Sequence, residues 1–191
     1  MTRKRVAVLI SGRGSNLQAL MDARQNAYEI VLVVSNVPGV AGLERARAAG
    51  IEAIALDHKP YGKNREAFER DLDALLIERR VDLVALAGFM RVLTPYFVRA
   101  WAGRLVNIHP SLLPKHPGVN THARALEAGD AEHGCTVHLV VEEVDAGEII
   151  GQAQTPILPG DTPETLANRV LELEHDLYPR CLAEFARTLA A

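Results

Sequence analysis

The chain has 191 residues, of which 48% are hydrophobic and 24% are charged. This composition is ordinary for a globular protein and excludes a disordered chain, and the length suits roughly one domain. The net charge of -3 disfavours a nucleic-acid binder, which normally carries a basic domain. No apolar run approaches the roughly 18 residues of a membrane span, so we expect no membrane partner. Only two cysteines, Cys135 and Cys181, predict reduced thiols and a cytoplasmic location.

Short apolar runs alternate with amphipathic stretches through the first part of the chain. We expect strands at Val6–Ile10, Ile30–Val34, Glu52–Leu56, Val81–Ala87 and Leu105–Ile108. The helices between them are expected at Asn16–Ala27, Leu43–Ala49 and Asn64–Arg79, with a further helix beginning at Thr94 and Pro95. The alternation predicts an α/β fold with a mainly parallel, doubly wound, Rossmann-like sheet.

The character of the chain changes after Ile108. Pro110–Thr121 carries three prolines and is expected to be a loop, followed by a short helix at Ala123–Ala128. Strands at Thr136–Val141 and Ile149–Pro156, separated by Glu142–Gly147, predict an antiparallel extension of the sheet. Thr162 followed by Pro163 predicts the start of a long C-terminal helix, which Pro179 should kink or break. We expect a single domain over residues 1–191.

Three unusual segments follow the ends of predicted strands: Ser11–Asn16, Gly88–Arg91 and Asn107–Pro110. Open parallel sheets bind ligands at the carboxyl ends of their strands, so these segments predict one site. The first is a Gly-rich turn before a helix, whose free backbone N–H groups favour a phosphate. It lacks the glycine and lysine patterns of dinucleotide and triphosphate loops, so a phosphate monoester fits better. A tight turn that only caps the helix, with Ser15 or Asn16, is an equal alternative for the turn alone.

Asn107 and His109 are two residues apart, so on a strand both side chains point to the same face. A carboxamide donor beside an imidazole suits the stabilisation of charge on a carbonyl oxygen. The alternative is a hydrogen-bonded pair that closes the strand. Five of the seven histidines fall between His109 and His138, but without a close helical pair or a Cys-x-x-Cys, so we expect no metal site. By themselves, Asp145 in an acidic turn and Glu174 on a helix are interpreted as solvated surface.

Together these segments resemble the phosphoribosylglycinamide formyltransferases, folate-dependent enzymes of purine synthesis, in their short bacterial form. The resemblance covers nearly the whole chain and is carried by Val8–Ala19, Leu86–Leu93, Asn107–Pro114, His133–His138, Asp145–Ile150 and Glu174–His175. The run Asn-Ile-His-Pro-Ser-Leu-Leu-Pro is typical of folate formyl-transfer enzymes as a group. The Ser-Gly-x-Gly-Ser-Asn turn and the chain length narrow the resemblance to the phosphoribosylglycinamide formyltransferases among them. The resemblance implies transfer of the formyl group of 10-formyltetrahydrofolate, a cosubstrate, to the amine of glycinamide ribonucleotide, giving formylglycinamide ribonucleotide and tetrahydrofolate.

The resemblance also implies roles for individual residues. Asn107, His109 and Asp145 match the catalytic trio: the amide donates to the formyl oxygen, the imidazole acts as general acid, and the carboxylate keeps it charged. The ribonucleotide site is matched by Gly14, Ser15 and Asn16 at the phosphate and by Glu174 at the glycinamide end. The folate site is matched by Arg65, Met90, Arg91, Val92, Leu93, Val141, Glu142, Glu143 and Val144. Residues 1–110 then form the phosphate-binding half and 111–191 the folate-site half.

Two departures from the family pattern stand out. Asn120 replaces a histidine that relatives often carry, and Ala146-Gly147-Glu148 follows Asp145 in place of the commoner Gly-Gly-Pro. Two other functions remain open, a formyltetrahydrofolate hydrolase-like enzyme and a non-catalytic sensor of a phosphoribosyl ligand. The sensor would need neither Asn107 nor His109. We expect small-molecule partners, no nucleic acid, no metal, and a monomer or homodimer.

Overall fold

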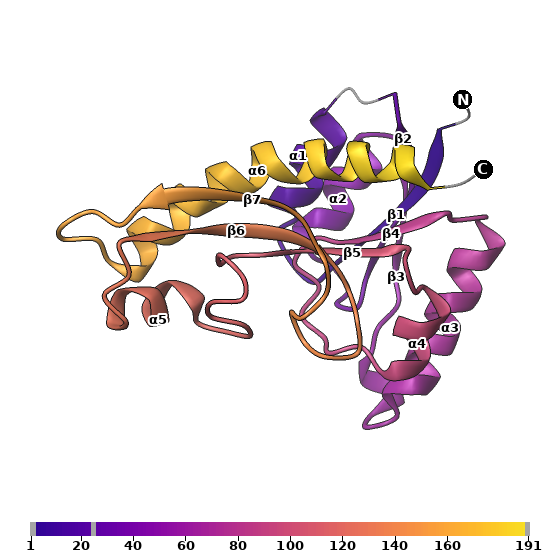
Figure 1. Cartoon of the computed structure of the whole chain (residues 1–191). Coiled ribbons are helices and arrows are strands. Elements are labelled where there is room, and N and C mark those ends of the chain that lie inside the picture. Colours follow the sequence, from indigo (N-terminus) through magenta and orange to yellow (C-terminus); the bar gives the residue numbers. More distant parts are fainter. Residues whose placement is uncertain (1–2, 24–25, 190–191) are drawn as a thin grey trace.

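The structure, a computed structural model, describes residues 3–23 and 26–189, and its one seven-stranded sheet is shown in Figure 1. The strands are β1 (Lys4–Ile10), β2 (Tyr28–Ser35), β3 (Glu52–Ala55), β4 (Leu83–Leu86), β5 (Leu105–His109), β6 (Glu132–Leu139) and β7 (Ile149–Pro156). Their order across the sheet is β3-β2-β1-β4-β5-β6-β7. β1 to β5 pair in parallel, whereas β6 is antiparallel to both β5 and β7. The predicted doubly wound sheet with an antiparallel extension is confirmed.

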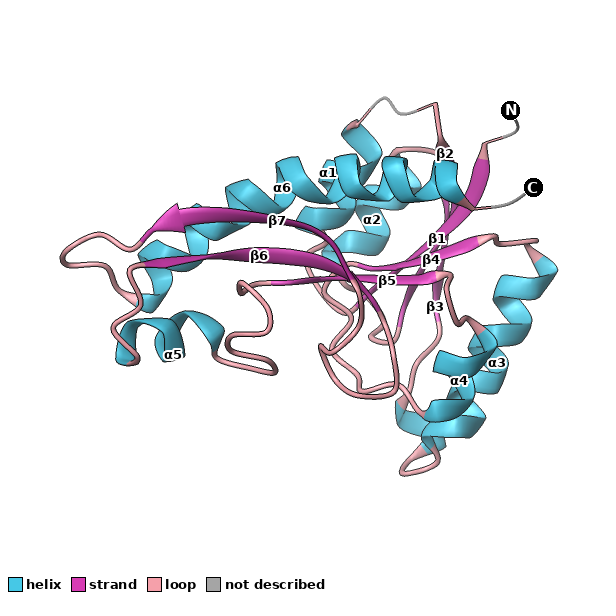
Figure 2. Cartoon of the chain, viewed as in Figure 1, coloured by secondary structure: helices cyan, strands magenta, loops and turns pink. Residues whose placement is uncertain are grey.

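Helices cover both faces of this sheet (Figure 2). α1 (Ser15–Asp22), α2 (Ala41–Ala48) and the long α6 (Pro163–Thr188) pack on one face, and α3 (Arg65–Glu78) and α4 (Pro95–Ala100) pack on the other. The 3-10 turn η1 (Lys59–Tyr61) precedes α3, and α5 (Thr121–Glu127) precedes β6. Side chains along β1 alternate between the two cores, with Val6 and Val8 beneath α6 and Ala7 and Leu9 beneath α3. Such double coverage explains why Val6–Ile10 of β1 is apolar without interruption.

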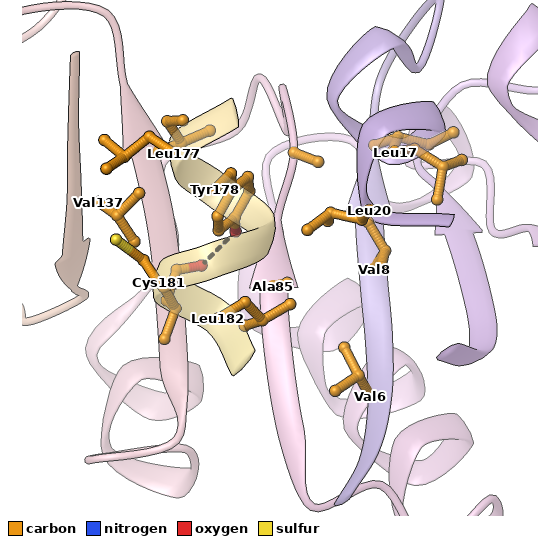
Figure 3. Close-up of a cluster of buried hydrophobic side chains, with 14 of the residues drawn as sticks. Val6, Val8, Leu17, Leu20, Ala85, Val137, Leu177, Tyr178, Cys181 and Leu182 are labelled. Atoms are coloured by element: carbon orange, nitrogen blue, oxygen red, sulfur yellow. Dashed lines mark hydrogen bonds between the residues drawn. The ribbon is translucent and has the colours of Figure 1, made fainter. Parts of the chain in front are cut away.

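The C-terminal helix α6 begins where the sequence predicts. The Thr162 hydroxyl accepts from the Thr165 backbone N–H, the Thr165 hydroxyl accepts from the Thr162 N–H, and Pro163 is the first helical residue. Figure 3 shows Tyr178 and Cys181 of this helix packed over the sheet. The Tyr178 hydroxyl donates to the Leu86 carbonyl at 2.9 Å, so α6 is also tied to β4 by a buried hydrogen bond.

Of the two outcomes predicted for Pro179, a kink or a break of α6, the break is wrong, because the helix continues to Thr188. A proline inside a helix removes one backbone hydrogen bond and costs about 3 kcal/mol. Here Tyr178, Pro179 and Leu182 are all buried, and the apolar area that they remove from water offsets that cost. Within the part of the chain that is described, neither α6 nor any other helix is long and apolar enough to cross a membrane.

Two other predicted boundaries differ from the structure. α1 ends at Asp22, not at Ala27, and residues 24–25 of the predicted helix lie outside the described residues. The Ala27 carbonyl accepts from the Lys4 N–H at 3.0 Å, so the chain already pairs with β1 before β2 begins. β6 begins at Glu132, four residues before the predicted start, because its polar first residues pair with the end of β7.

Candidate functional site

The centre of the candidate site is the end of β5. Asn107 and His109 alternate with Val106 and Ile108, which belong to the core beneath α6. The two polar side chains therefore point to the opposite face of the sheet, as their spacing predicts. Across the antiparallel pairing with β6, Asn107 lies opposite His138, and this register brings a second imidazole beside the amide.

Asp145 lies in the turn between β6 and β7 and reaches both imidazoles. One carboxylate oxygen, Oδ2, is 3.4 Å from His109 Nδ1, and the other, Oδ1, is 3.6 Å from His138 Nε2. The Gly118 backbone N–H donates to Oδ2 at 2.8 Å, and the Asp145 side chain is only 10% exposed. The interpretation of Asp145 as a solvated turn residue is therefore wrong, and the structure brings it together with Asn107 and His109.

Both ring nitrogens of His109 face an oxygen acceptor. Nε2 lies 3.0 Å from the His116 backbone carbonyl and donates its proton there. His116 adopts a left-handed backbone conformation with φ of 52°, and its own ring lies 2.7 Å from an Asp130 carboxylate oxygen. These contacts fix the orientation of the buried His109 ring. They leave Nδ1 as the nitrogen that faces Asp145 and can exchange a proton at the site.

His138 belongs to the same cluster, and the sequence did not single it out for the site. Its Nε2 lies 3.2 Å from the amide nitrogen of Asn107, and its Nδ1 lies 2.8 Å from the Leu139 carbonyl oxygen. Burial is the main cause that lowers the pKa of this imidazole. Only the pairing of β5 with β6 places His138 beside Asn107, and the sequence does not specify that register.

The Gly-rich turn between β1 and α1 is built around Gly14. This residue is the N-cap of α1 and has φ of 73°, which a side chain rarely adopts. A Cβ at Gly14 would lie 2.8 Å from the Cα of Gly42, so α2 also requires glycine here. The capping alternative is wrong for Ser15 and Asn16, because neither is the N-cap. The backbone N–H groups at the start of α1 point out of the turn.

Asn16 and Glu174 connect this turn to α6. The Asn16 amide nitrogen donates to Glu174 Oε2 at 2.6 Å, and both residues are buried. The interpretation of Glu174 as part of a solvated helix face is therefore wrong. Burial raises the pKa of its carboxyl, and the hydrogen bond from Asn16 acts in the opposite direction. The amide oxygen of Asn16 is buried without a hydrogen-bond partner among the described residues, so a bound ligand or water is expected there.

Ser15 lies on the outer side of the same turn. With Arg45, His175 and other residues it lines an open cavity of about 630 Å³ between α1 and α6. The Arg45 guanidinium donates to the Arg13 carbonyl at 3.0 Å and so borders the turn. Arg45 could not be predicted from the sequence pattern, because it belongs to α2, which only the fold brings to the turn.

The segment after β4 exposes apolar side chains. Met90 is 74% exposed and Val92 is 59% exposed, which is unusual for large apolar residues. The Met90 N–H donates to the Ser11 hydroxyl at 2.8 Å, and Arg65 donates to the Val92 carbonyl at 3.1 Å. Two segments that the sequence predicts to converge, Ser11–Asn16 and Gly88–Arg91, are thus in direct contact.

The remaining predicted folate residues lie around this segment. The Arg91 guanidinium is 4.9 Å from the centre of the Phe68 ring, and Leu93 is partly buried against the core beneath α3. In the loop after β6, Val141 and Val144 are exposed, Glu143 is exposed, and Glu142 pairs with Arg99 at 2.6 Å.

Three further histidines, His116, His122 and His133, form a second cluster. His122 Nδ1 and His133 Nε2 lie 3.1 Å apart, and the rings of His116 and His133 are in edge contact. Burial lowers the pKa of His122, and it lowers the pKa of His133 to about 4. Over residues 3–23 and 26–189, no three His, Cys, Asp or Glu side chains are placed to hold a metal ion.

Comparisons with known proteins agree with this geometry. Residues 4–182 match the formyl transferase family. A trifunctional purine biosynthetic protein adenosine-3 of Drosophila melanogaster is 56% identical over 186 residues, which are 95% of this chain but 14% of that protein. The chain thus spans about one seventh of that relative. The phosphoribosylglycinamide formyltransferase of Escherichia coli K12 is 48% identical over 95% of this chain and 86% of that protein.

Solved structures of similar proteins superpose closely on this chain. A glycinamide ribonucleotide transformylase 1 from Symbiobacterium toebii superposes with a TM-score of 0.93 at 44% identity, covering 97% of this chain and 89% of that chain. A phosphoribosylglycinamide formyltransferase from Coxiella burnetii superposes with a TM-score of 0.91 at 47% identity, covering 97% of this chain and 88% of that chain.

Proposed function

Because the chain belongs to the formyl transferase family, we propose that it transfers the formyl group of 10-formyltetrahydrofolate to the amine of glycinamide ribonucleotide. The observation that carries the proposal is the convergence of Asn107, His109 and Asp145 on one face of the sheet. The name of the similar bacterial proteins, phosphoribosylglycinamide formyltransferase, supports this substrate. The name of the Drosophila relative, a trifunctional purine biosynthetic protein, supports a place in purine synthesis. The buried free thiols of Cys135 and Cys181 fit a cytoplasmic setting.

In this reaction the substrate amine attacks the formyl carbon, and negative charge develops on the formyl oxygen. The Asn107 amide N–H donates to that oxygen, a contact that strengthens as the charge grows. The bond between the formyl carbon and the folate nitrogen then breaks, and that nitrogen takes a proton from His109 Nδ1. The incoming amine loses a proton, which Asp145 accepts through water and returns to His109. Each proton that is released is taken up again within this cycle, and none of these steps uses a metal ion.

The ribonucleotide is proposed to lie between the Gly-rich turn and α6. Its phosphate accepts hydrogen bonds from the backbone N–H groups at the start of α1, with Gly14, Ser15 and Asn16 in the turn. Glu174 lies at the glycinamide end, and the unpartnered Asn16 oxygen accepts a hydrogen bond from the ligand.

The folate is proposed to lie along the exposed apolar residues. Met90, Val92 and Leu93 provide one wall, with Val141 and Val144, Glu142 and Glu143 opposite. Arg65 and Arg91 lie at the outer end of the same segment, where their charges suit the carboxylates of a glutamate tail.

The test is a deformylation assay with the purified chain. Loss of the formyl group from 10-formyltetrahydrofolate is followed by absorbance with and without glycinamide ribonucleotide. We expect formyl loss to require the ribonucleotide and to yield one formylated amine for each folate released. Equal loss with water alone would identify a hydrolase instead. Binding of the ribonucleotide without any formyl loss would identify a sensor.

A further inference from the structure

His138 has a hydrogen-bond pattern that specifies its protonation state. Its Nδ1 lies 2.8 Å from the Leu139 carbonyl oxygen, which can only accept, so Nδ1 carries a proton. Its Nε2 lies 3.2 Å from the Asn107 side-chain nitrogen, which can only donate, so Nε2 presents its lone pair. The side chain is 2% exposed, which disfavours a charged ring. The two contacts together require the neutral imidazole with its proton on Nδ1.

We propose that His138 is a positioning residue that holds the Asn107 amide with its nitrogen, rather than its oxygen, toward the reacting groups. A flipped amide would place its oxygen against the lone pair of Nε2, and two acceptors repel. The His138 ring therefore selects one of the two amide orientations. One amide proton is used on His138, and the second remains for the formyl oxygen. The inference rests on the proposed function, in which Asn107 is the donor to that oxygen.

The position of His138 makes this selection relevant to the chemistry. Its Nε2 is 3.6 Å from Asp145 Oδ1, and the other oxygen of Asp145 is 3.4 Å from His109 Nδ1. An amide nitrogen that points toward His138 therefore also points toward Asp145 and His109, which move protons in the proposed reaction. The competing interpretation is that His138 carries protons with Asp145. That role needs a proton on Nε2, which would displace the closer Asn107 nitrogen as partner.

A double-mutant cycle tests the proposal. His138→Phe keeps the ring but removes both nitrogens, and we expect kcat to fall about 10- to 100-fold while KM for both substrates changes less than about twofold. His138→Gln restores an acceptor near Nε2 and should recover most of the loss. In an Asn107→Ala background, His138→Phe should cost less than about twofold more, because the amide that it positions is gone. A fully additive loss would overturn the proposal.

A second measurement uses the unmodified chain and does not depend on activity. Nitrogen-15 NMR of the histidine rings at pH 7, with His138 assigned from the His138→Gln spectrum, should show a protonated Nδ1 and an unprotonated Nε2. A proton on Nε2, or a charged ring, would overturn the proposal. Failure of the proposed function is distinguishable, because the unmodified chain would then show no ribonucleotide-dependent formyl loss, whatever the protonation state of His138.

Discussion

At the scale of single residues, the charge of Asp145 links the two imidazoles of the site, because its two oxygens face one each. We predict that Asp145→Asn keeps the shape of the side chain but lowers turnover on the order of 100-fold or more. The variant has no carboxylate facing His109 Nδ1, so it lacks the base that accepts the amine proton in the proposed reaction. Ribonucleotide binding at the phosphate turn should change little. The measurement is the pH–rate profile, with calorimetry for binding.

The matched control is Glu148→Gln, which removes an exposed carboxylate from the same turn. It should leave both turnover and the pH profile unchanged. A wild-type profile and near-normal turnover in Asp145→Asn would remove Asp145 from the mechanism.

The sequence predicts some of these residues by pattern and others only by resemblance. Asn107 and His109 follow from the two-residue period of a strand. Asp145 and Glu174 do not, because their sequence neighbours are charged and only the tertiary fold buries them. His138 lies in a motif that carries the family resemblance, but its contact with Asn107 depends on cross-strand register. Patterns within one element were therefore predictable, whereas the side-chain contacts of Asp145, Glu174 and His138 with other elements were not.

At the scale of elements, long periodic segments were predicted well and short boundaries were not. α3 begins after Asn64, whose side chain accepts from the Ala67 N–H, and ends within one residue of the predicted Arg79. α1 and β6 differ by several residues, because sheet pairing at Ala27 and at Glu132 overrides the local pattern. The predicted break of α6 does not occur for a similar reason, because the packing around Pro179 outweighs the backbone hydrogen bond that this proline removes.

The turn between β1 and α1 supports a prediction at this scale. We expect Gly14→Ala to weaken ribonucleotide binding at least about tenfold while folate binding stays within about twofold. The new Cβ would lie 2.8 Å from the Gly42 backbone in a left-handed conformation that costs about 1–2 kcal/mol, so the N–H groups at the start of α1 must move. Isothermal titration calorimetry with each ligand measures both affinities.

The control is Gly12→Ala in the same turn, where a Cβ meets no atom within 4 Å. Its thermal unfolding should match that of the unmodified chain, whereas Gly14→Ala should unfold at a lower temperature. Equal loss of both ligands in Gly14→Ala would indicate general misfolding rather than a damaged phosphate site.

At the scale of the whole molecule, the alternation of strands and helices was enough to predict the fold class. Each buried parallel strand is a short apolar run, and each crossover helix carries an apolar stripe, so the two signals are separable in the sequence. The change after Ile108 correctly predicted an antiparallel extension. His133 lies on β6 of this extension and His122 lies on α5, which precedes it, and these two imidazoles affect the stability of the whole chain.

His122 and His133 are neutral in the folded protein because burial lowers the pKa of both, that of His133 to about 4. In the unfolded chain both rings take up protons below about pH 6.5. Between these values the unfolded state binds more protons, so the free energy of unfolding must fall as the pH falls from about 6.5 to about 4. Below the folded pKa both states are protonated, and the His133 contribution stops changing.

We therefore predict that urea unfolding at pH 7 and at pH 4.5 will show a loss of stability on the order of 2 kcal/mol from His133 alone. His133→Gln can keep the hydrogen bond to His122 but cannot titrate, so it should reduce the slope between these pH values. His58→Gln alters a half-buried histidine that bonds to Asn36, away from the pair, and should keep the slope. Carboxyl groups such as Glu174, whose pKa is raised by burial, also take up protons in this range, so the imidazole contribution is the difference in slope between His133→Gln and the unmodified chain. An unchanged slope in His133→Gln would show that other groups cause the low-pH instability and that the His122–His133 pair does not.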